Sequence, residues 1–179
     1  PLRRQRQMCI RDRYKLASFV DEQRMNRLYE KFILEYYAKE CPQVKATASQ
    51  IRWILDDGIG TMLPSMQSDI MLTKGSDVLI IDAKYYTHTT QVQYDVHTLH
   101  SGNLYQIFTY VKNKDAEFGD KEHSVSGMLL YAATDEDIQP DSSYMMSGNR
   151  ISVKTLDLNQ PFEKIAEQLN SIVCENFNI

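Results

Sequence analysis

Cysteine is scarce in this chain of 179 residues, and the few that are present form no recognisable pattern. The three cysteines, Cys9, Cys41 and Cys174, are an odd number and lie far apart, with no Cys-x-x-Cys pair. Disulfide frameworks and structural zinc sites need paired or closely spaced cysteines. The sequence therefore predicts reduced thiols, as expected of a cytoplasmic protein.

Long hydrophobic runs and nucleotide-binding glycine motifs are also missing. No apolar stretch approaches the roughly 20 residues that a membrane span requires, and no secretory signal is present. Gly58 and Gly60 do not continue into a Gly-x-Gly-x-x-Gly fingerprint, and the chain has no P-loop lysine motif. We therefore expect no membrane partner, and any hydrolysis of nucleoside triphosphates must belong to another polypeptide.

Positive charge is not in excess, because the formal net charge is −4. Affinity for DNA comes largely from cations on phosphates, so this balance argues against strong DNA binding without a partner. The arginines of residues 3–12 resemble a translated sequencing adapter more than a basic nucleic-acid-binding arm, the alternative reading of such a run. We expect residues 1–13 to be a non-native leader and residues 14–179 to form one domain.

Residues 69–84 contain the most informative pattern of the chain. Two apolar runs, residues 70–73 and 78–83, are separated by the turn sequence Lys-Gly-Ser-Asp. Short β-rich runs on either side of a glycine-containing turn predict a β-hairpin. A two-residue loop of Gly75 and Ser76, or a four-residue loop around them, gives the same pairing register.

This register places Asp69 directly opposite Asp82, and Lys84 projects from the same face of the strand as Asp82. At about 5 Å and an effective dielectric of ~20 the two carboxylates repel by roughly 3 kcal/mol, more than a favourable cross-strand pair returns. Two converging carboxylates can hold Mg²⁺, and a nearby lysine can orient or deprotonate a water. The alternative is a surface hairpin in which Lys84 neutralises one aspartate.

Short motifs in a fixed order resemble those of the PD-(D/E)XK nucleases. Asp69 followed by Asp82-Ala83-Lys84 matches the signature, although Ser68 stands where the pattern often has proline. Further along, Gln-Ile-Phe-Thr-Tyr matches the QxxxY motif of RecB-type members. With residues 28–32 included, the order most resembles the McrC family, the nuclease subunits of McrBC modification-dependent restriction systems.

The resemblance implies a fold, a reaction and a metal site. The fold would be a mixed central β-sheet flanked by helices, with an αβββαβ core, and the reaction would be endonucleolytic hydrolysis of DNA phosphodiesters. Asp69, Asp82 and the backbone carbonyl of Ala83 would hold Mg²⁺, for which Mn²⁺ could substitute. Lys84 would position or activate the attacking water.

The resemblance also implies supporting residues and partners. Gln106 and Tyr110 would position the substrate, and Glu30, at the border of a helical apolar stripe, would be an outer carboxylate. An McrB-like AAA+ GTPase would recognise DNA that carries 5-methylcytosine and translocate it, while this chain, as the C-terminal part of a longer McrC-like protein, cuts it.

Two other functions remain open at this stage. One is a catalytically inert nuclease-fold scaffold, or a module that stimulates the GTPase. The complete Asp–Asp–Ala–Lys set argues against it, because an unused acidic pair would keep its repulsion without benefit. The other is a RecB-like exonuclease domain, which would act on free DNA ends.

The rest of the pattern predicts an α/β fold without help from the resemblance. Residues 25–40 have helical spacing and end at Pro42, while residues 51–55 alternate as a half-buried strand does. The later expected elements are a helix with its buried stripe at 104–111, a buried strand at 127–133, a more exposed strand at 151–156 and a helix that begins near Pro161. The polar stretch 87–103 carries three histidines whose spacing fits no recognised metal site: His88, His97 and His100.

Overall fold

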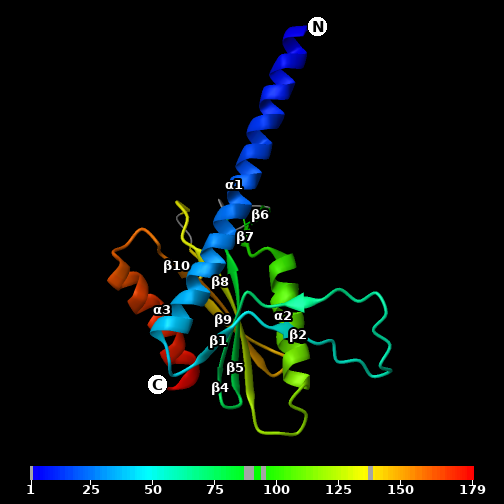
Figure 1. The fold of residues 1–179 in the computed structure, drawn as a ribbon, viewed down its shortest axis with the longest axis vertical. Coiled ribbons are helices and arrows are strands. Elements are labelled where there is room, and N and C mark those ends of the chain that lie inside the picture. The colour runs from blue at the N-terminus through cyan, green and yellow to red at the C-terminus, as the bar shows by residue number, and fades with distance from the viewer. Residues whose placement is uncertain (1, 87–90, 94–95, 137–138) are drawn as a thin grey trace.

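The computed structural model describes residues 2–86, 91–93, 96–136 and 139–179, with the backbone alone for 2–20, 91–93 and 96–98. In this part of the chain a six-stranded mixed sheet has helices on both faces (Figure 1). The helices are α1 (Leu2–Glu40), α2 (Ser101–Ala116) and α3 (Phe162–Phe177). The strands of the large sheet are β1 (Lys45–Thr47), β4 (Ile70–Lys74), β5 (Asp77–Lys84), β8 (Ser124–Ala132), β9 (Ser142–Met146) and β10 (Asn149–Leu156). Two short antiparallel pairs lie outside it: β2 (Gln50–Ile51) with β3 (Met66–Gln67), and β6 (Gln91–Gln93) with β7 (Val96–Thr98).

The sheet order is β1-β4-β5-β8-β10-β9, so β5 and β8 lie in its middle. The β5–β8 and β8–β10 pairs are parallel, and the other pairs are antiparallel. Both central strands are almost continuously apolar, because side chains on their two faces are covered by helices. The mixed α/β fold class predicted from the sequence is therefore confirmed.

The predicted hairpin forms with the predicted register. Lys74 pairs with Asp77 and Ile70 pairs with Ile81, which leaves Gly75 and Ser76 as the two loop residues. Gly75 has a φ of +62°, a left-handed conformation that glycine adopts without steric cost. Because side chains alternate along a strand, this register decides which face of the sheet each residue of β5 joins.

The two faces of the sheet carry separate hydrophobic cores. Ile70, Leu79 and Ile81 pack under α1 and α3, whereas Val78 and Ile80 pack under α2. Figure 1 shows α2 on one side of the strands and α1 with α3 on the other. Any polar residue of β5 that shares the alternation of Val78 and Ile80 must therefore lie on the α2 face.

Helix α1 ends at Glu40, as predicted from Pro42, but it begins at Leu2, well before residue 25. No glycine or proline lies between residues 2 and 41, so nothing in the sequence interrupts the helix. Its last turns are fixed to α3 by the fully buried Tyr37, whose hydroxyl donates a hydrogen bond to the Leu169 carbonyl at 3.1 Å. No helix of the described residues combines the length and apolarity that crossing a membrane would need.

Three strand predictions need correction. The strand expected over residues 51–55 is limited to β2, because only Gln50 and Ile51 find partners, in β3; the edge beside β4 is formed by β1 instead. No element was expected between the strands at 127–133 and 151–156, but β9 lies there and pairs with β10. Strand β10 is consequently more buried than expected, since it lies between β8 and β9.

Gly127 allows α2 to approach the sheet closely. A Cβ at this position of β8 would lie 2.7 Å from Val111 Cγ2 and 2.9 Å from Ile107 Cγ1, both in α2.

We expect Gly127→Ala to lower the free energy of unfolding by about 1–3 kcal/mol, because helix and sheet would have to move apart. Urea denaturation measures this change. The control is Gly102→Ala, in the first turn of α2, where a Cβ meets open space; equal stability of the two variants would contradict the prediction.

Candidate metal centre

The two predicted aspartates meet at the end of the β4–β5 hairpin. Asp82 and Lys84 alternate with Val78 and Ile80 along β5 and so lie on the α2 face. Asp69 immediately precedes β4, and continuation of the hairpin register places it opposite Asp82. The pairing of the two hairpin strands thus brings the two aspartates and Lys84 together.

Lys84 bridges the two carboxylates. Its Nζ donates a hydrogen bond to Asp82 Oδ1 at 2.9 Å and lies 4.0 Å from Asp69 Oδ2. Asp82 is 1% exposed, whereas the Asp69 side chain is 20% exposed. The centre is therefore buried at Asp82 and reaches solvent through Asp69.

One oxygen of Asp82 lacks a partner. Oδ2 is buried and accepts no hydrogen bond from any described residue, whereas a protonated Asp82 can donate one to the Asp69 carboxylate. Burial raises the pKa of Asp82, and the nearby Asp69 carboxylate raises it further, to about 7, against the opposing effect of Lys84. A buried carboxylate with an unsatisfied oxygen is costly unless a cation or a proton compensates it.

Lys84 keeps its proton despite its burial. Burial lowers the pKa of a lysine, but the charges of Asp82 and Asp69 outweigh this and raise it above the ordinary value. Lys84 is therefore a cation at neutral pH. In this state it can donate hydrogen bonds and offset negative charge, but it cannot accept a proton.

The backbone of Ala83, between Asp82 and Lys84, holds the Asp69 carboxylate in place. Its N–H donates a hydrogen bond to Asp69 Oδ2 at 2.9 Å. In an antiparallel ladder the N–H and C=O of one residue lie on the same edge of the strand, so the Ala83 carbonyl also faces the side of Asp69. Strand β4 begins only at Ile70, and Ser68 pairs instead with Ser49, whose carbonyl accepts a hydrogen bond from the Ser68 N–H at 3.0 Å.

Glu30 approaches this centre from α1. Burial raises its pKa, with an added contribution from the Asp69 carboxylate and an opposing one from Lys84. The Asn26 amide donates a hydrogen bond to Glu30, and its Oδ1 accepts one from the Tyr85 N–H at 2.8 Å. Helix α1 is thereby attached to the residue that follows Lys84, and Glu30 lies near enough to Asp69 and Lys84 for their charges to affect its pKa.

Gln106 and Tyr110 lie together on α2, as their spacing predicts. Gln106 Nε2 donates a hydrogen bond to the Tyr110 hydroxyl at 2.9 Å. Within the described residues, neither side chain forms a hydrogen bond or ion pair with Asp69, Asp82 or Lys84. The structure therefore confirms that the two side chains are paired, and their role stays a prediction.

The three histidines of residues 87–103 do not assemble a site in what the structure describes. His88 lies outside the described residues, and only the backbone of His97, in β7, is described. His100 immediately precedes α2, where its ring centroid lies 5.4 Å from that of Tyr86. No metal-ligand role for them emerges from this placement.

A polar and aromatic cluster beside Lys84 escaped the sequence analysis. Tyr131 pairs with Lys84 on the neighbouring strand β8, and its hydroxyl accepts a hydrogen bond from Asn103 Nδ2 at 3.0 Å. Asn103 Oδ1 accepts another from the Tyr86 hydroxyl at 3.3 Å. The only sequence signal was the position of Tyr86 just after Lys84, because Tyr131 stands within an otherwise apolar strand.

The donor set is suited to a hard cation that keeps several waters. Among the described residues, no group of three or more His, Cys, Asp and Glu side chains is arranged to hold a metal ion. Mg²⁺, however, is commonly bound through one or two carboxylates, with water and substrate phosphate supplying the other oxygens. Asp69, Asp82 and the Ala83 carbonyl fit that mode, and the unpartnered Asp82 Oδ2 is the atom that gains most from it.

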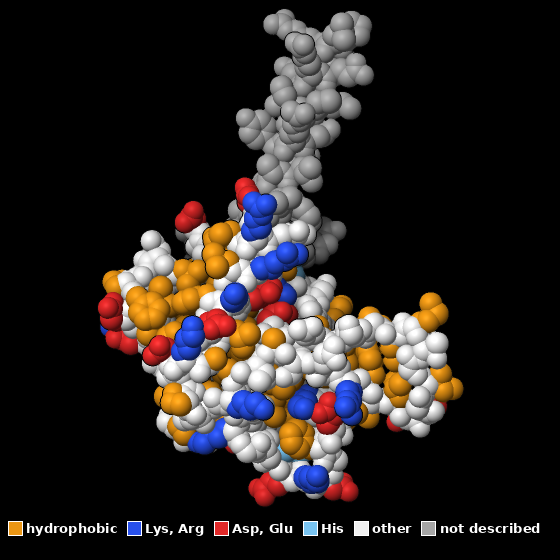
Figure 2. All heavy atoms as spheres, in the orientation of Figure 1, with side chains coloured by type: hydrophobic (Ala, Val, Ile, Leu, Met, Phe, Trp, Pro, Cys, Tyr) orange, Lys and Arg blue, Asp and Glu red, His pale blue; other side chains and the backbone are white. Residues whose placement is uncertain are grey.

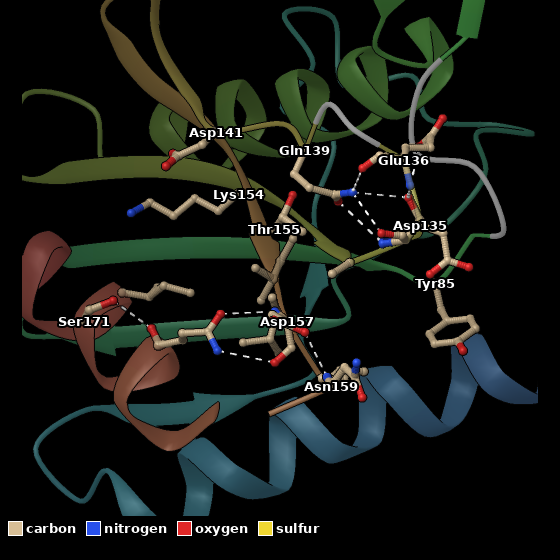
Figure 3. A pocket seen from close by; sticks show the side chains of 17 residues that line it. Tyr85, Asp135, Glu136, Gln139, Asp141, Lys154, Thr155, Asp157, Asn159 and Ser171 are labelled. Carbon is tan, nitrogen blue, oxygen red and sulfur yellow. Dashed lines mark hydrogen bonds between the residues drawn. The ribbon is translucent and has the colours of Figure 1, made fainter. Parts of the chain in front are cut away.

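A separate cavity lies at the carboxyl ends of β8 and β10, on the α3 side of the sheet (Figure 3). Its volume is about 840 Å³, and it shares Tyr85 with the surroundings of the metal centre, but neither Asp69 nor Asp82 lines it. The charged residues of its lining are four carboxylates and one lysine, and the amide of Gln168 binds both the N–H and the carbonyl of Asp157. This cavity repels phosphate and is not the predicted site.

The fold and the centre together define an α/β protein with two opposed aspartates and a lysine at the end of a central hairpin. Residues 2–132 match the family model described as McrBC 5-methylcytosine restriction system component, and the chain belongs to this family. The predicted McrC-like identity is thereby confirmed.

A curated relative agrees with this assignment. The chain is 30% identical over 158 residues to a protein of Escherichia coli (strain K12) named Type IV methyl-directed restriction enzyme EcoKMcrBC. The match covers 87% of this chain and 44% of the relative, so the chain spans less than half the length of that protein.

The raised pKa of Asp82 makes stability depend on pH. Because the folded protein holds this proton up to about pH 7 and the unfolded chain releases it near pH 4, stability falls as the pH rises through that window. We expect Asp82→Asn to be more stable than the wild type at pH 8, by up to about 4 kcal/mol, since a pKa raised by about three units, with the attraction of Lys84 already included, corresponds to ~4 kcal/mol. The difference should vanish near pH 4.

Thermal or urea unfolding at several pH values, without divalent cations, measures this effect. The matched control is Asp120→Asn, at an exposed aspartate. A stability difference between Asp82→Asn and the wild type that is the same at pH 4 and pH 8 would contradict the prediction.

Proposed function

We propose that this chain is the metal-dependent DNA endonuclease subunit of a modification-dependent restriction system. It would hydrolyse phosphodiesters in DNA that carries 5-methylcytosine, together with an AAA+ GTPase partner that recognises and translocates the DNA. The observation that supports this most directly is the buried Asp82 with an unpartnered Oδ2, opposite Asp69 and beside Lys84.

The cost of this arrangement favours a functional site over a structural one. The fold buries a carboxylate, places another carboxylate across the hairpin and leaves one oxygen without a donor. Each of these features opposes folding. A cation held by Asp69, Asp82 and the Ala83 carbonyl would compensate all of them, which an inert scaffold would not require.

The reaction would use a divalent cation and the charge of Lys84. A bound Mg²⁺ supplies Lewis acidity to a phosphate oxygen and lowers the pKa of water. The raised pKa of Lys84 supports a role as a cationic donor, because a protonated Nζ can orient a water and offset charge that develops on the phosphate. This narrows the role expected from the sequence, where activation by proton abstraction was an alternative.

The surrounding residues would place the substrate. Gln106 and Tyr110, joined by their own hydrogen bond, would contact the DNA backbone from α2. Glu30, held by Asn26 on α1, would act as an outer carboxylate that orders water near Asp69. When only the strands of the large sheet are considered, the order α1, β1, β4, β5, α2, β8 is compatible with the αβββαβ core of PD-(D/E)XK nucleases.

Two properties of the sequence support a separate GTPase subunit that hydrolyses GTP and holds the DNA. Its sequence has no P-loop lysine motif, and its net charge of −4 is unfavourable for holding DNA alone. Membership of the McrBC family supports a partner that supplies both functions. The matched relative carries the words methyl-directed restriction enzyme in its name, which supports modified DNA as the substrate.

The cation site can be tested without DNA or partner. In calorimetric titrations with Mn²⁺ and Mg²⁺ we expect binding to the wild type, and binding at least about tenfold weaker to Asp82→Asn, because one of two carboxylate ligands is lost. Asp120→Asn should bind as the wild type does. If Asp82→Asn bound the cations equally well, the measured site would lie elsewhere and the proposal would lose its main support.

Removal of the Lys84 side chain should reduce the rate of DNA cleavage strongly but have little effect on the affinity for the cation. We expect Lys84→Ala to cut at least about 100-fold more slowly, since a single donor to developing charge contributes 10²–10³ in rate, while it still binds Mn²⁺. The assay uses covalently closed circular DNA that carries 5-methylcytosine, with the GTPase subunit and GTP. Degradation only after the circle is linearised would favour the RecB-like exonuclease instead, and equal rates for both proteins would exclude Lys84 from the reaction.

A further inference from the structure

Residues 53–64 form a projecting segment between β2 and β3, which we name the finger. Figure 1 shows it as the loop that stands farthest from the sheet on the side of α2. The β2–β3 pair closes its base through Ile51 and Met66. The finger is thus an excursion of the chain from a fixed stem.

The base of the finger is attached to the body of the protein. Trp53 Nε1 donates a hydrogen bond across the finger to the Pro64 carbonyl at 2.7 Å. The Ile54 N–H donates another to Asn113 Oδ1, on α2, at 2.9 Å. Asn113 lies two turns beyond Gln106 on the same helix, so the finger is fixed to the helix that would place the DNA.

The outer part of the finger exposes large apolar side chains. Met62 is 97% exposed, Ile59 is 69% exposed, and Ile54 and Leu63 are each more than 40% exposed. Figure 2 shows hydrophobic side chains along the outer edge of this lobe. Met62 also has a φ of 68°, in the left-handed region that favours glycine. Several apolar side chains together on one projecting element are typical of a surface that is covered by a partner.

The charges of the finger indicate which kind of partner. The finger, residues 53–64, contains no lysine, arginine or histidine and includes Asp56 and Asp57; the adjacent cation, Arg52, lies at its base. A phosphate backbone or an anionic lipid surface would be repelled, since both are bound through cations. A protein surface with an apolar groove and a basic rim complements both the tip and the two aspartates.

We propose that the finger is a docking element whose apolar tip, centred on Met62 and Ile59, inserts into an apolar groove with a Lys- or Arg-bearing rim on a protein partner of the restriction complex. The choice of the GTPase subunit as the probe for this partner rests on the proposed function. Rigid attachment at Trp53 and Ile54 lowers the entropic cost of docking. Because Asn113 fixes the finger to α2, a partner bound at the tip would be held close to that helix.

The experiment combines binding with site-specific photo-crosslinking. Met62→p-benzoylphenylalanine places a photo-reactive group at the tip, and Met145→p-benzoylphenylalanine, at a 72% exposed methionine on the edge strand β9, is the matched control. Each protein is irradiated with the GTPase subunit and duplex DNA, and the cross-linked peptides are identified by mass spectrometry. We expect the tip to cross-link to an apolar segment of the GTPase subunit and the control not to do so.

Affinity gives an independent readout. The double variant Ile59→Ser with Met62→Ser should bind the immobilised GTPase subunit at least about tenfold more weakly than the wild type, because apolar anchors at the centre of an interface carry much of its affinity. Met145→Ser should bind as the wild type does. Mn²⁺ titration of the double variant should be unchanged, which shows that the metal centre is intact.

Several results would overturn the docking proposal without affecting the nuclease proposal. These are cross-links from the tip to DNA, to a second copy of this chain or to the same chain, and equal affinity of the double variant and the wild type. Failure of the wild type to bind the GTPase subunit would overturn the docking proposal and the GTPase partnership together, but not the cation site. Loss of Mn²⁺ binding in Asp82→Asn is independent of all of them. The two proposals therefore fail by different measurements.

Discussion

The burial of Asp82 opposite Asp69 is the constraint on which the other contacts at this end of the sheet depend. Two like charges in a largely apolar layer are tolerated only if neighbouring groups compensate them. Lys84 does so with its ammonium group, and the Ala83 N–H does so with a hydrogen bond to Asp69. Glu30 adds a further carboxylate from α1, so the negative charge of the three carboxylates is only partly neutralised by Lys84. A bound cation would therefore stabilise the centre.

The fold was most predictable where it is local. The β4–β5 hairpin depends on a short turn and on alternation within a few residues, and its register was therefore legible from the sequence. Strand β9 was missed because an exposed edge strand needs no apolar alternation and is defined by its partner β10. The strand expected at residues 51–55 was too long for the opposite reason. Ile51 and Trp53 are both apolar because they pack against the core under α2, but only Ile51 has a strand partner, in β3.

The proximity of Asp69, Asp82 and Lys84 was predictable from the sequence, but the energetics of the candidate site were not. The position of Asp82 relative to Asp69 followed from pairing, whereas the unpartnered oxygen of Asp82 depends on burial by elements distant in sequence. The same holds for Tyr131, which is adjacent to Lys84 only because β8 lies parallel to β5. Contacts between strands distant in sequence produce no periodic pattern in the sequence. A residue such as Tyr131 can therefore line the site although no sequence motif marks it.

The alternation of β5 also limits how this protein can change in length over evolution. A single residue gained or lost within β5 between the turn and Asp82 would rotate that carboxylate to the opposite face, into the apolar core beneath α1 and α3. A residue gained in the two-residue loop at Gly75 would only lengthen the loop and leave the pairing intact. Length variation among relatives should therefore concentrate at the tip of this hairpin, and the two strands should form a block of constant length.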